Sequence, residues 1–555
     1  MKNRIAEILA MIFTLTSVVC AQGMESPPIT SFKPDTSLPK VNVPEFVITG
    51  KAQVDLPEPE KQSIEIDSSY FQGQNLQGIG IELPVNSFSN QGTGNAGNTS
   101  SLFARASIGS YVTATYLIAG GGEASGYLLH GSLSCDYTSG FMNNTMTRNF
   151  AIAGGVSKSF EMSEGLESTS SMDFGYSRES YFLYGGPQPS LVRAIDHFGA
   201  GIASDFNFGG MPLATGLSFE RFSTNDVWDA VQSAVKLHAA TQVDLSSGSI
   251  GINGSLRFGS HTIDSSSNEI AVPPLLTTSL DKSFYDLTIG ADYNDTLGDL
   301  SYSLGLHYFQ YEDDLSNGIA KLYPDLRANY TLDNVLSLFS RFYGTINEPE
   351  LSSFISVDRY LDGRLPLRNT QNYGNFTLGG RVAATNELTI IPQINIEGAR
   401  YFPIFVSDLL NDNELYYANK ATIFTTSIMA EYKKGQFSVD VTLNSRAGTA
   451  DSLSSIPNLA PFDLNMNANY QVTPQFTASG YLLILSARYS DLALSNKINA
   501  SWFLNFRLSY NLTVGQMPLE IFAEGKNLLD QKYYIWQGYR EFPLTLSIGI
   551  SSKIL

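Results

Sequence analysis

Apolar and polar residues alternate along a long stretch near the C-terminus, from Lys497 to Leu512. Its even positions, which include Trp502, Leu504 and Phe506, form one apolar face, and its odd positions carry mostly charged, amide and hydroxyl groups. Period two is the geometry of a β-strand. Strands of soluble sandwiches usually run only about 5–6 residues, whereas a membrane-spanning strand needs roughly 9–11 tilted residues. The stretch therefore predicts one strand of an outer-membrane barrel, with the apolar face toward lipid and the polar face toward the lumen.

The same alternation recurs in successive segments from residue 101 to the C-terminus, for example at 127–137, 285–293, 300–308 and 437–444. Short turns between the segments alternate with mostly longer loops, and this is the arrangement of a transmembrane barrel. We therefore predict an all-β fold, a large antiparallel barrel of about 22 strands over residues 101–555. An even number of strands places both ends of the barrel on the periplasmic side.

Composition supports a barrel in contact with lipid. Charged residues make up 16% of the chain, against about 25% in ordinary soluble domains. There are 33 Phe and 29 Tyr, and aromatic rings gather at the two membrane interfaces of such barrels. Beyond the N-terminal region no apolar run is long enough for a transmembrane helix. The net charge of -19 argues against nucleic acid or an anionic lipid surface as a partner, because both are bound by basic patches.

The N-terminus predicts export. Lys2 and Arg4 precede an apolar stretch at 8–19 and a site of small residues, so residues 1–21 are expected to be a secretory signal peptide. An alternative is a lipoprotein acylated at Cys20. With the barrel pattern, export predicts the outer membrane of a Gram-negative-type bacterium.

Residues 22–63 are rich in proline and cannot build a core, so we expect a disordered periplasmic tail. Within it lies a β-prone hexapeptide suited to pairing with the sheet edge of another protein. Its residues are Glu45, Phe46, Val47, Ile48, Thr49 and Gly50. Residues 64–100 are rich in Gly, Ser and Asn and are predicted to be a linker or a short segment in the lumen.

Catalytic patterns are missing from the sequence. It has no HExxH, no GxSxG and no phosphate-binding loop, so we predict neither an enzyme nor a cofactor or metal site. His130 and His307 fall on the polar, lumenal phase of their segments. The acidic run at 312–314 lacks the ligand spacing of a calcium site, and we expect it to be solvated loop charge.

Two stretches resemble a known family. The first lies near the C-terminus and leads into the last strand, and its residues are Asn527, Leu528, Leu529, Asp530, Lys532, Tyr533, Gly538 and Tyr539. It resembles the C-terminal signature of TonB-dependent receptor barrels. Residues 347–351 and 365–369, followed by Gly379, resemble a loop of the same family, and the hexapeptide 45–50 resembles its TonB box. The resemblance implies uptake of a small solute across the outer membrane and engagement by the periplasmic protein TonB.

The sequence departs from that family in one respect that bears on function. Only about 50 residues separate Gly50 from the first strand, whereas the family places a globular plug there and a typical domain has roughly 100 residues. Two alternatives to TonB-dependent uptake therefore stay open. One is a passive, porin-like diffusion channel, and the other is a non-transport barrel that acts with a separate plug or partner protein. The sequence does not identify the solute.

Overall fold

The protein is described from a computed structural model. The described residues are 101–163, 166–208, 210–226, 228–265, 280–332, 335–407, 413–515 and 517–553. The predicted signal peptide, the proline-rich tail, the hexapeptide 45–50 and the segment 64–100 lie outside them.

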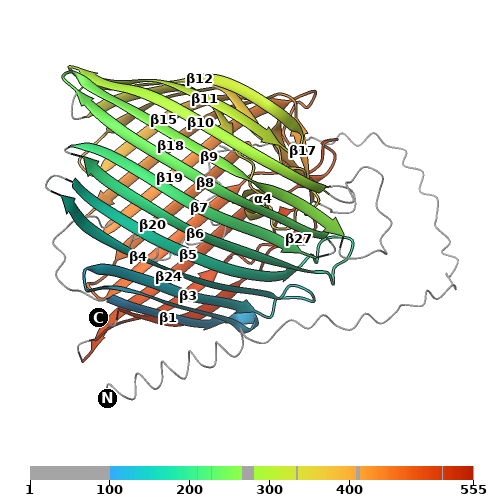
Figure 1. The fold of residues 1–555 in the computed structure, drawn as a ribbon. Coiled ribbons are helices and arrows are strands. Elements are labelled where there is room, and N and C mark those ends of the chain that lie inside the picture. The colour runs from blue at the N-terminus through green and yellow to red at the C-terminus, as the bar shows by residue number, and fades with distance from the viewer. Residues whose placement is uncertain are drawn as a thin grey trace.

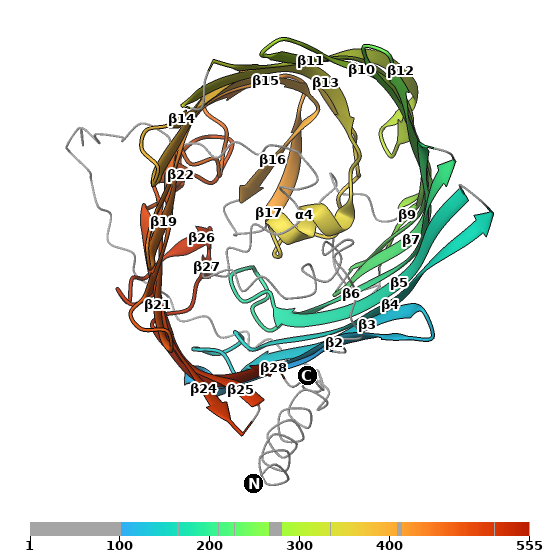
Figure 2. The same cartoon turned by 90° about the vertical axis from the view of Figure 1, so that its left-hand side faces the viewer.

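Twenty-two strands form one closed antiparallel barrel, as the alternation predicted (Figures 1 and 2). Each strand pairs with the next barrel strand along the chain, and the last pairs with the first, from Phe103 opposite Lys553 to Gly109 opposite Ser547. Closure leaves no sheet edge unpaired, which a structure in hydrocarbon requires. The barrel strands are β1 (Ser101–Gly109), β2 (Thr113–Ala124), β3 (Tyr127–Thr138), β4 (Thr147–Ser163), β5 (Leu166–Phe182), β6 (Val192–Phe208), β7 (Met211–Asn225), β8 (Trp228–Leu245), β9 (Gly248–Ser265), β10 (Leu280–Leu297), β11 (Leu300–Asp313), β12 (Ser316–Thr331), β13 (Leu336–Asn347), β14 (Thr370–Ala383), β15 (Leu388–Arg400), β18 (Ala421–Lys434), β19 (Phe437–Ala450), β20 (Phe462–Gln471), β21 (Phe476–Leu485), β24 (Ser501–Val514), β25 (Met517–Lys526) and β28 (Thr545–Lys553).

The remaining elements lie in the longer loops, all at the same end of the barrel. They are η1 (Ser110–Val112), α4 (Leu351–Val357), β16 (Phe402–Ser407), β17 (Asn413–Ala418), β22 (Arg488–Tyr489), β23 (Lys497–Ile498), β26 (Tyr534–Trp536) and β27 (Tyr539–Arg540). In the part of the chain that is described, no helix combines the length and the apolarity that crossing a bilayer takes. We call the long-loop end the outer mouth, because the short turns and both barrel ends lie at the opposite, periplasmic end.

The apolar face of the strands points outward, away from the lumen. In β24, Trp502 is 50% exposed and Phe506 39%, while the alternating Phe503 and Asn505 are 7% and 4% exposed. Since the outer surface has no protein neighbour, these exposed rings face lipid. Rings also meet across strands beside the periplasmic turns, where Phe437 contacts Tyr432 and Tyr470 at centroid distances of 6.2 and 6.3 Å. They form part of an interfacial aromatic girdle.

The prediction of one continuous strand from Lys497 to Leu512 was wrong at its first residues. The barrel strand β24 begins at Ser501, and Lys497 and Ile498 form β23 in an outer-loop hairpin with β22. The alternation continues across this break because Ile498 is apolar and falls on an even-numbered position, like the lipid-facing residues of β24. Ile498 is apolar for another reason, since it is buried in the loop. Periodicity records which side chains are apolar, not where the backbone turns.

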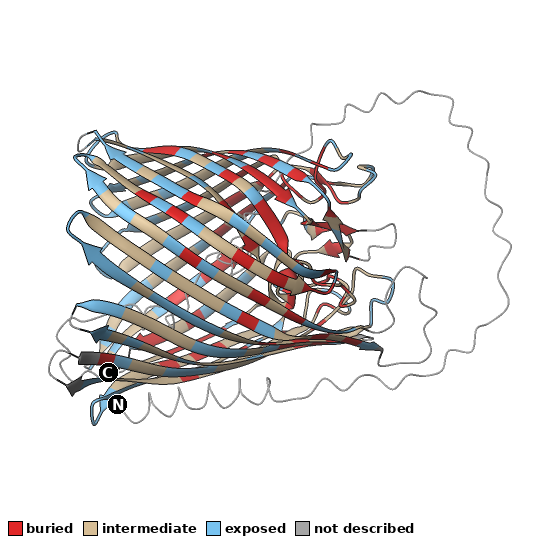
Figure 3. Ribbon diagram, turned by 45° about the horizontal axis from the view of Figure 1, so that its top comes forward, coloured by how far each residue is buried: buried red, intermediate tan, exposed pale blue. Residues whose placement is uncertain are grey.

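The wall of the barrel is uneven in height. Strands β4, β5 and β6 have 17 residues and β8, β9 and β10 have 18, whereas β20, β21 and β25 have 10 and β1 and β28 have 9. At about 3.3 Å per residue and a tilt near 40°, these lengths correspond to heights of roughly 45 and 25 Å. The short strands only span the apolar layer, so the long strands form a tall wall beyond it. Figure 3 shows buried residues gathering toward the long-loop end.

Candidate functional site: a lid of loops at the outer mouth

Three outer loops fold inward over the lumen instead of extending into solvent. They comprise residues 348–369, 401–420 and 527–544, and we call them the lid; 408–412 lie outside the description. Viewed along the barrel, α4 and the β16–β17 hairpin lie inside the ring of strands (Figure 2). The lid therefore occupies the outer mouth, where a solute from outside would enter.

Helix α4 supplies the apolar core of the lid. Its seven residues place Leu351, Phe354 and Ile355 on one face, and all three are buried. They pack with other lid residues against the lumenal face of the tall wall. The members of this cluster from the lid are Leu351, Phe354, Ile355, Tyr360, Leu361, Leu365, Leu367, Phe405, Trp536 and Tyr539, and those from the wall are Tyr181, Ile195, Phe222, Ala230 and Ile263. This buried apolar cluster fixes the lid to the lumenal face of the barrel wall.

A stack of tyrosine rings joins two of the lid loops. Tyr360 and Tyr539 lie parallel, with centroids 3.6 Å apart and planes at 11°. Tyr184, from the loop after β5, meets both rings edge-on at 5.9 and 5.3 Å. Gly538 has a φ of +83° in the β26–β27 turn. A Cβ on Gly185 would lie 2.7 Å from the backbone of Gly538, so the two glycines allow the loops to approach closely. The C-terminal signature therefore meets, at this stack, the segment that connects 347–351 to 365–369.

The first residue of the C-terminal signature fastens the loop 527–544. Asn527 is 3% exposed, and its backbone N–H donates to Asn505 Oδ1 at 2.9 Å. Its side-chain amide donates to the carbonyls of Gln531 and Phe542 at 3.0 and 3.1 Å. The N–H of Leu544 donates to Asp530 Oδ1 at 3.1 Å, which closes the loop at its far end.

The other signature residues also shape this loop. Leu528 N–H donates to the carbonyl of Leu504 at 2.8 Å, Leu529 is exposed, and Tyr533 meets Phe503 edge-on at 4.0 Å. Lys532 is exposed. These contacts belong to the architecture of the lid.

Buried polar groups fasten the lid to the tall wall. Arg193 of β6, with its side chain 3% exposed, pairs with Asp226 at 2.6 Å. It also donates to the carbonyls of Leu361 and Arg359 at 2.5 and 3.2 Å. Gln232 of β8 donates to the carbonyl of Pro349 at 3.1 Å and accepts from the N–H of Leu351 at 2.8 Å. Because these groups are shielded from water, breaking one contact leaves its partner unsatisfied, which is costly.

The acidic run at 312–314 takes part in the same fastening, so the expectation of solvated loop charge was wrong. Asp314 Oδ2 accepts from the N–H of Leu367 at 2.7 Å and lies 2.6 Å from Nδ1 of His261. Asp313 Oδ2 accepts from the N–H of Asn369 at 2.9 Å. The acids are turned inward because lid N–H groups need acceptors away from water.

One buried acid of the lid has a strongly shifted pKa. Asp358, directly after α4, is fully buried, and burial raises its pKa to about 7, although the N–H of Tyr360 donates to its Oδ1 at 3.0 Å. Above that pH the lid holds an ionised carboxylate away from water. The packing of the lid is therefore expected to depend on pH near neutrality.

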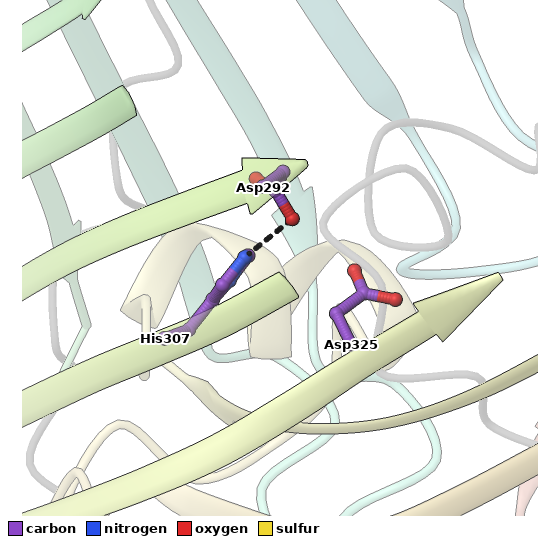
Figure 4. Close-up of side chains that lie close together, drawn as sticks. All are labelled: Asp292, His307 and Asp325. Carbon is purple, nitrogen blue, oxygen red and sulfur yellow. Dashed lines mark hydrogen bonds and ion pairs between the residues drawn. The ribbon is translucent and has the colours of Figure 1, made fainter. Parts of the chain in front are cut away.

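On the lumen wall, Asp292, His307 and Asp325 converge from β10, β11 and β12 (Figure 4). Their ligand-type atoms lie within 4.8 Å of one another, and His307 Nε2 is 3.1 Å from Asp292 Oδ1. However, Asp325 accepts four hydrogen bonds, from Arg327 at 3.2 and 2.6 Å and from Arg341 at 3.0 and 2.8 Å. Two guanidinium groups already compensate this carboxylate, so we assign the cluster to a network that ties β10 to β13 and not to a metal.

The sequence missed the groups that hold the lid. Arg193, Gln232 and Asp358 fit ordinary strand and loop patterns, and their partners lie more than 100 positions away in two of the three cases. The resemblances at 347–351 and 365–369 and at the C-terminal signature were the signals that pointed to this region. The hexapeptide 45–50 was predicted as a partner-binding segment and stays a prediction, because it lies outside the described residues.

Comparisons with known proteins agree on the fold. No protein-family model matches the sequence, and no curated protein matches it. Among solved structures, the chain is similar to the FrpB iron transporter from Neisseria meningitidis (F5-1 variant), with a TM-score of 0.65 and 9% identity over 83% of each chain. It is also similar to the siderophore receptor PiuA from Acinetobacter baumannii, with a TM-score of 0.60 and 9% identity over 83% of this chain and 82% of that one. It is similar as well to the copper transporter OprC, with a TM-score of 0.62 and 10% identity over 83% of this chain and 81% of that one.

These likenesses confirm the predicted resemblance at the level of the barrel. A closed barrel of 22 strands with a lipid-facing apolar surface is an outer-membrane architecture. The chain is thus an outer-membrane β-barrel of a Gram-negative-type bacterium, with the fold of transport and receptor barrels.

Proposed function

We propose that this chain takes up a small solute across the outer membrane as a gated barrel, in the manner of TonB-dependent receptors. The observation that carries the proposal is the lid. A passive diffusion channel needs a wet path, whereas here an apolar cluster of outer loops is packed and hydrogen-bonded into the outer mouth. The similar solved structures are described as iron, siderophore and copper transporters or receptors, which supports transport without identifying this chain's solute.

Conductance in planar bilayers tests the gate. We expect the full chain to give little steady current and Gln232→Ala to give more frequent openings, because the substitution frees the start of α4 from the wall. Gln242→Ala is the matched control, since Gln242 lies on the same lumenal face of β8 near the periplasmic end, away from the lid. Large steady currents from the unmodified chain would support the porin-like alternative instead.

TonB contact is tested with the hexapeptide. A peptide spanning Pro44 to Lys51 should retain TonB in a pull-down, and Val47→Pro should abolish retention, because proline removes a backbone donor from the pairing strand. Ala52→Pro, outside the hexapeptide, is the control in a slightly longer peptide. If neither peptide retains TonB while a separate protein copurifies with the barrel, a partner-dependent barrel becomes the better account.

A further inference from the structure

Arginines gather on the outward face of one sector of the barrel wall. They are Arg148 of β4, Arg178 of β5 and Arg221 of β7, and we call them the arginine row. Strand register puts them on the face that meets lipid. Arg221 lies opposite Phe198, whose ring is 39% exposed, and Arg178 lies opposite Phe150. Since β4 to β7 are consecutive strands of the sheet (Figure 1), the three side chains share one continuous surface.

The arginine row lies at the outer boundary of the apolar surface. Each arginine is the next outward-facing residue after an aromatic one on the way to the outer mouth. The pairs are Phe150 and Arg148, Tyr176 and Arg178, and Phe219 and Arg221. Aromatic rings of such barrels gather at the level of the lipid head groups, so the guanidinium groups lie in the headgroup layer of the outer leaflet. On β8, β9 and β10 the residue in that place is a serine, namely Ser233, Ser260 and Ser283.

Positive charge exceeds negative charge on this surface. Asp196 of β6 is the acid that faces the arginine row. It lies 3.4 Å from Arg178 and accepts from the hydroxyl of Tyr176 at 2.6 Å, while the Arg178 side chain stays 55% exposed. Among the described residues, neither Arg148 nor Arg221 lies within ion-pairing distance of a carboxylate. Three guanidinium groups against one carboxylate leave a charge excess that an anion from the membrane can compensate.

The net charge of the whole chain, -19, does not oppose a local anionic ligand. Charges separated by more than a Debye length, about 8 Å at physiological ionic strength, are largely screened. The outward acid of β8, Asp229, lies opposite Asn225, which is four residues beyond Arg221 on β7. At about 3.3 Å per residue the separation is roughly 13 Å. An acidic chain therefore presents a basic sector to its surroundings.

The chemistry around the arginine row selects the class of anion. A guanidinium group matches phosphate, to which it donates two parallel hydrogen bonds. Below the row, the rings of Phe198 and Phe219 lie 6.1 Å apart and offer an apolar surface to acyl chains. Beyond the row, the outward residues Ser180 and Ser223 carry hydroxyl groups that suit sugar. Phosphate placed between acyl chains and sugars describes a phosphorylated glycolipid.

We propose that the arginine row binds the phosphate groups of a glycolipid of the outer leaflet. The acyl chains lie on the rings below the row, and the sugars lie against the hydroxyl groups of the tall wall above it. The row spans three strand spacings, roughly 14 Å at about 4.8 Å each, which suits a headgroup with more than one phosphate. The site is on the outer wall, so it is independent of the solute and of the uptake function proposed above.

Native mass spectrometry of the detergent-solubilised full chain tests the proposal. The probe is lipid A phosphorylated at both ends, and the comparisons are dephosphorylated lipid A and phosphatidylglycerol, all with EDTA so that divalent ions do not bridge the anions. Loss of the phosphates should weaken binding at least about tenfold, and phosphatidylglycerol should bind less tightly than lipid A. The triple variant Arg148→Gln, Arg178→Gln and Arg221→Gln should weaken lipid A binding by roughly 10- to 100-fold.

Lys158→Gln is the matched control. Lys158 is an outward cation of the same strand as Arg148 but near its periplasmic end, where its ammonium lies 4.1 Å from the ring centroid of Tyr127. Its loss should leave lipid A binding within about twofold, because the charge is more than a Debye length from the arginine row. Heat-modifiable migration on gels shows that each variant forms the barrel. The proposal is overturned if the triple variant binds like the parent, if dephosphorylated lipid A binds as tightly, or if phosphatidylglycerol binds equally well.

Asp196→Asn provides a second measurement with the opposite sign. Because Asp196 competes with phosphate for Arg178, its neutralisation should tighten lipid A binding by roughly two- to fivefold. Asp173→Asn is the control, since Asp173 lies on β5 like Arg178 but pairs with His130 on the lumenal face, and its loss should leave binding unchanged. Unchanged or weaker binding by Asp196→Asn would mean that the guanidinium groups do not hold phosphate directly, and would overturn the proposal.

Discussion

Replacing Tyr539 by Ala removes the ring that joins two loops of the lid. Tyr539 is 2% exposed and stacks on Tyr360 at 3.6 Å, with Tyr184 packed edge-on against it at 5.3 Å. Truncating a buried aromatic residue costs about 3–5 kcal/mol when the site does not collapse. Gly185 and Gly538 are in close backbone approach beside the ring, so the surrounding loops have little room to fill the cavity.

Most of this cost should fall on local opening of the lid, because the barrel wall is held by its own ladder of hydrogen bonds. Hydrogen exchange of the amides in α4 measures that opening. A loss of 3 kcal/mol corresponds to exchange faster by roughly 100-fold. The amides of β8 and β9 in the barrel wall should keep their protection.

Tyr534→Ala is the matched control for this experiment. Tyr534 is in the same loop, five positions earlier, and its side chain is 40% exposed, so its loss should change exchange in α4 by less than about threefold. The reasoning is refuted if Tyr539→Ala leaves α4 protected, or if both variants release α4 equally. Gel migration before and after heating shows whether each barrel is closed.

Three further outcomes are expected. Arg193→Ala should destabilise the lid by about 3–5 kcal/mol because it leaves Asp226 buried without this partner. Arg178→Ala, at an exposed pair with Asp196, should cost below about 1 kcal/mol. Hydrogen exchange of the α4 amides distinguishes the two variants, and equal losses of protection contradict the assignment. Burial raises the pKa of Asp358 from 3.8 to about 7, so the packed lid binds this proton more tightly than the open loop does. The free energy that holds the lid closed should therefore fall as pH rises from about 4 to about 7. Above pH 7 the total loss should be on the order of 4 kcal/mol. Exchange of α4, corrected for its intrinsic pH dependence, should show this trend, and a trend that persists in Asp358→Asn would assign it to another group. Phe506→Arg on the lipid face should weaken folding into bilayers by about 2–4 kcal/mol, while Asn511→Arg on the lumenal face of the same strand should have little effect; equal effects would mean that the faces are misassigned.

Local patterning along the chain was enough to predict the barrel. The alternation of β24 specifies which side chains face lipid, since period two is a local property of an extended chain. The rhythm of short turns and long loops specified about 22 strands and the position of the outer mouth. The same local reasoning misplaced the start of β24, because β23 continues the alternation after the backbone has left the barrel wall.

The role of the outer loops depends on contacts between segments far apart in the chain. The stack of Tyr360 on Tyr539 joins residues 179 positions apart, and Arg193 bonds to a carbonyl 168 positions away. No local pattern encodes such pairs. Each of these residues would fit the local sequence pattern of its own strand or loop equally well if it were exposed to solvent. Asp313 and Asp314 show the same limit: their sequence is that of a hydrated acidic turn, and they are buried because the N–H groups of a distant loop need acceptors there. Strand faces follow from covalent geometry along the chain, whereas the lid exists only once closure of the barrel brings distant strands together.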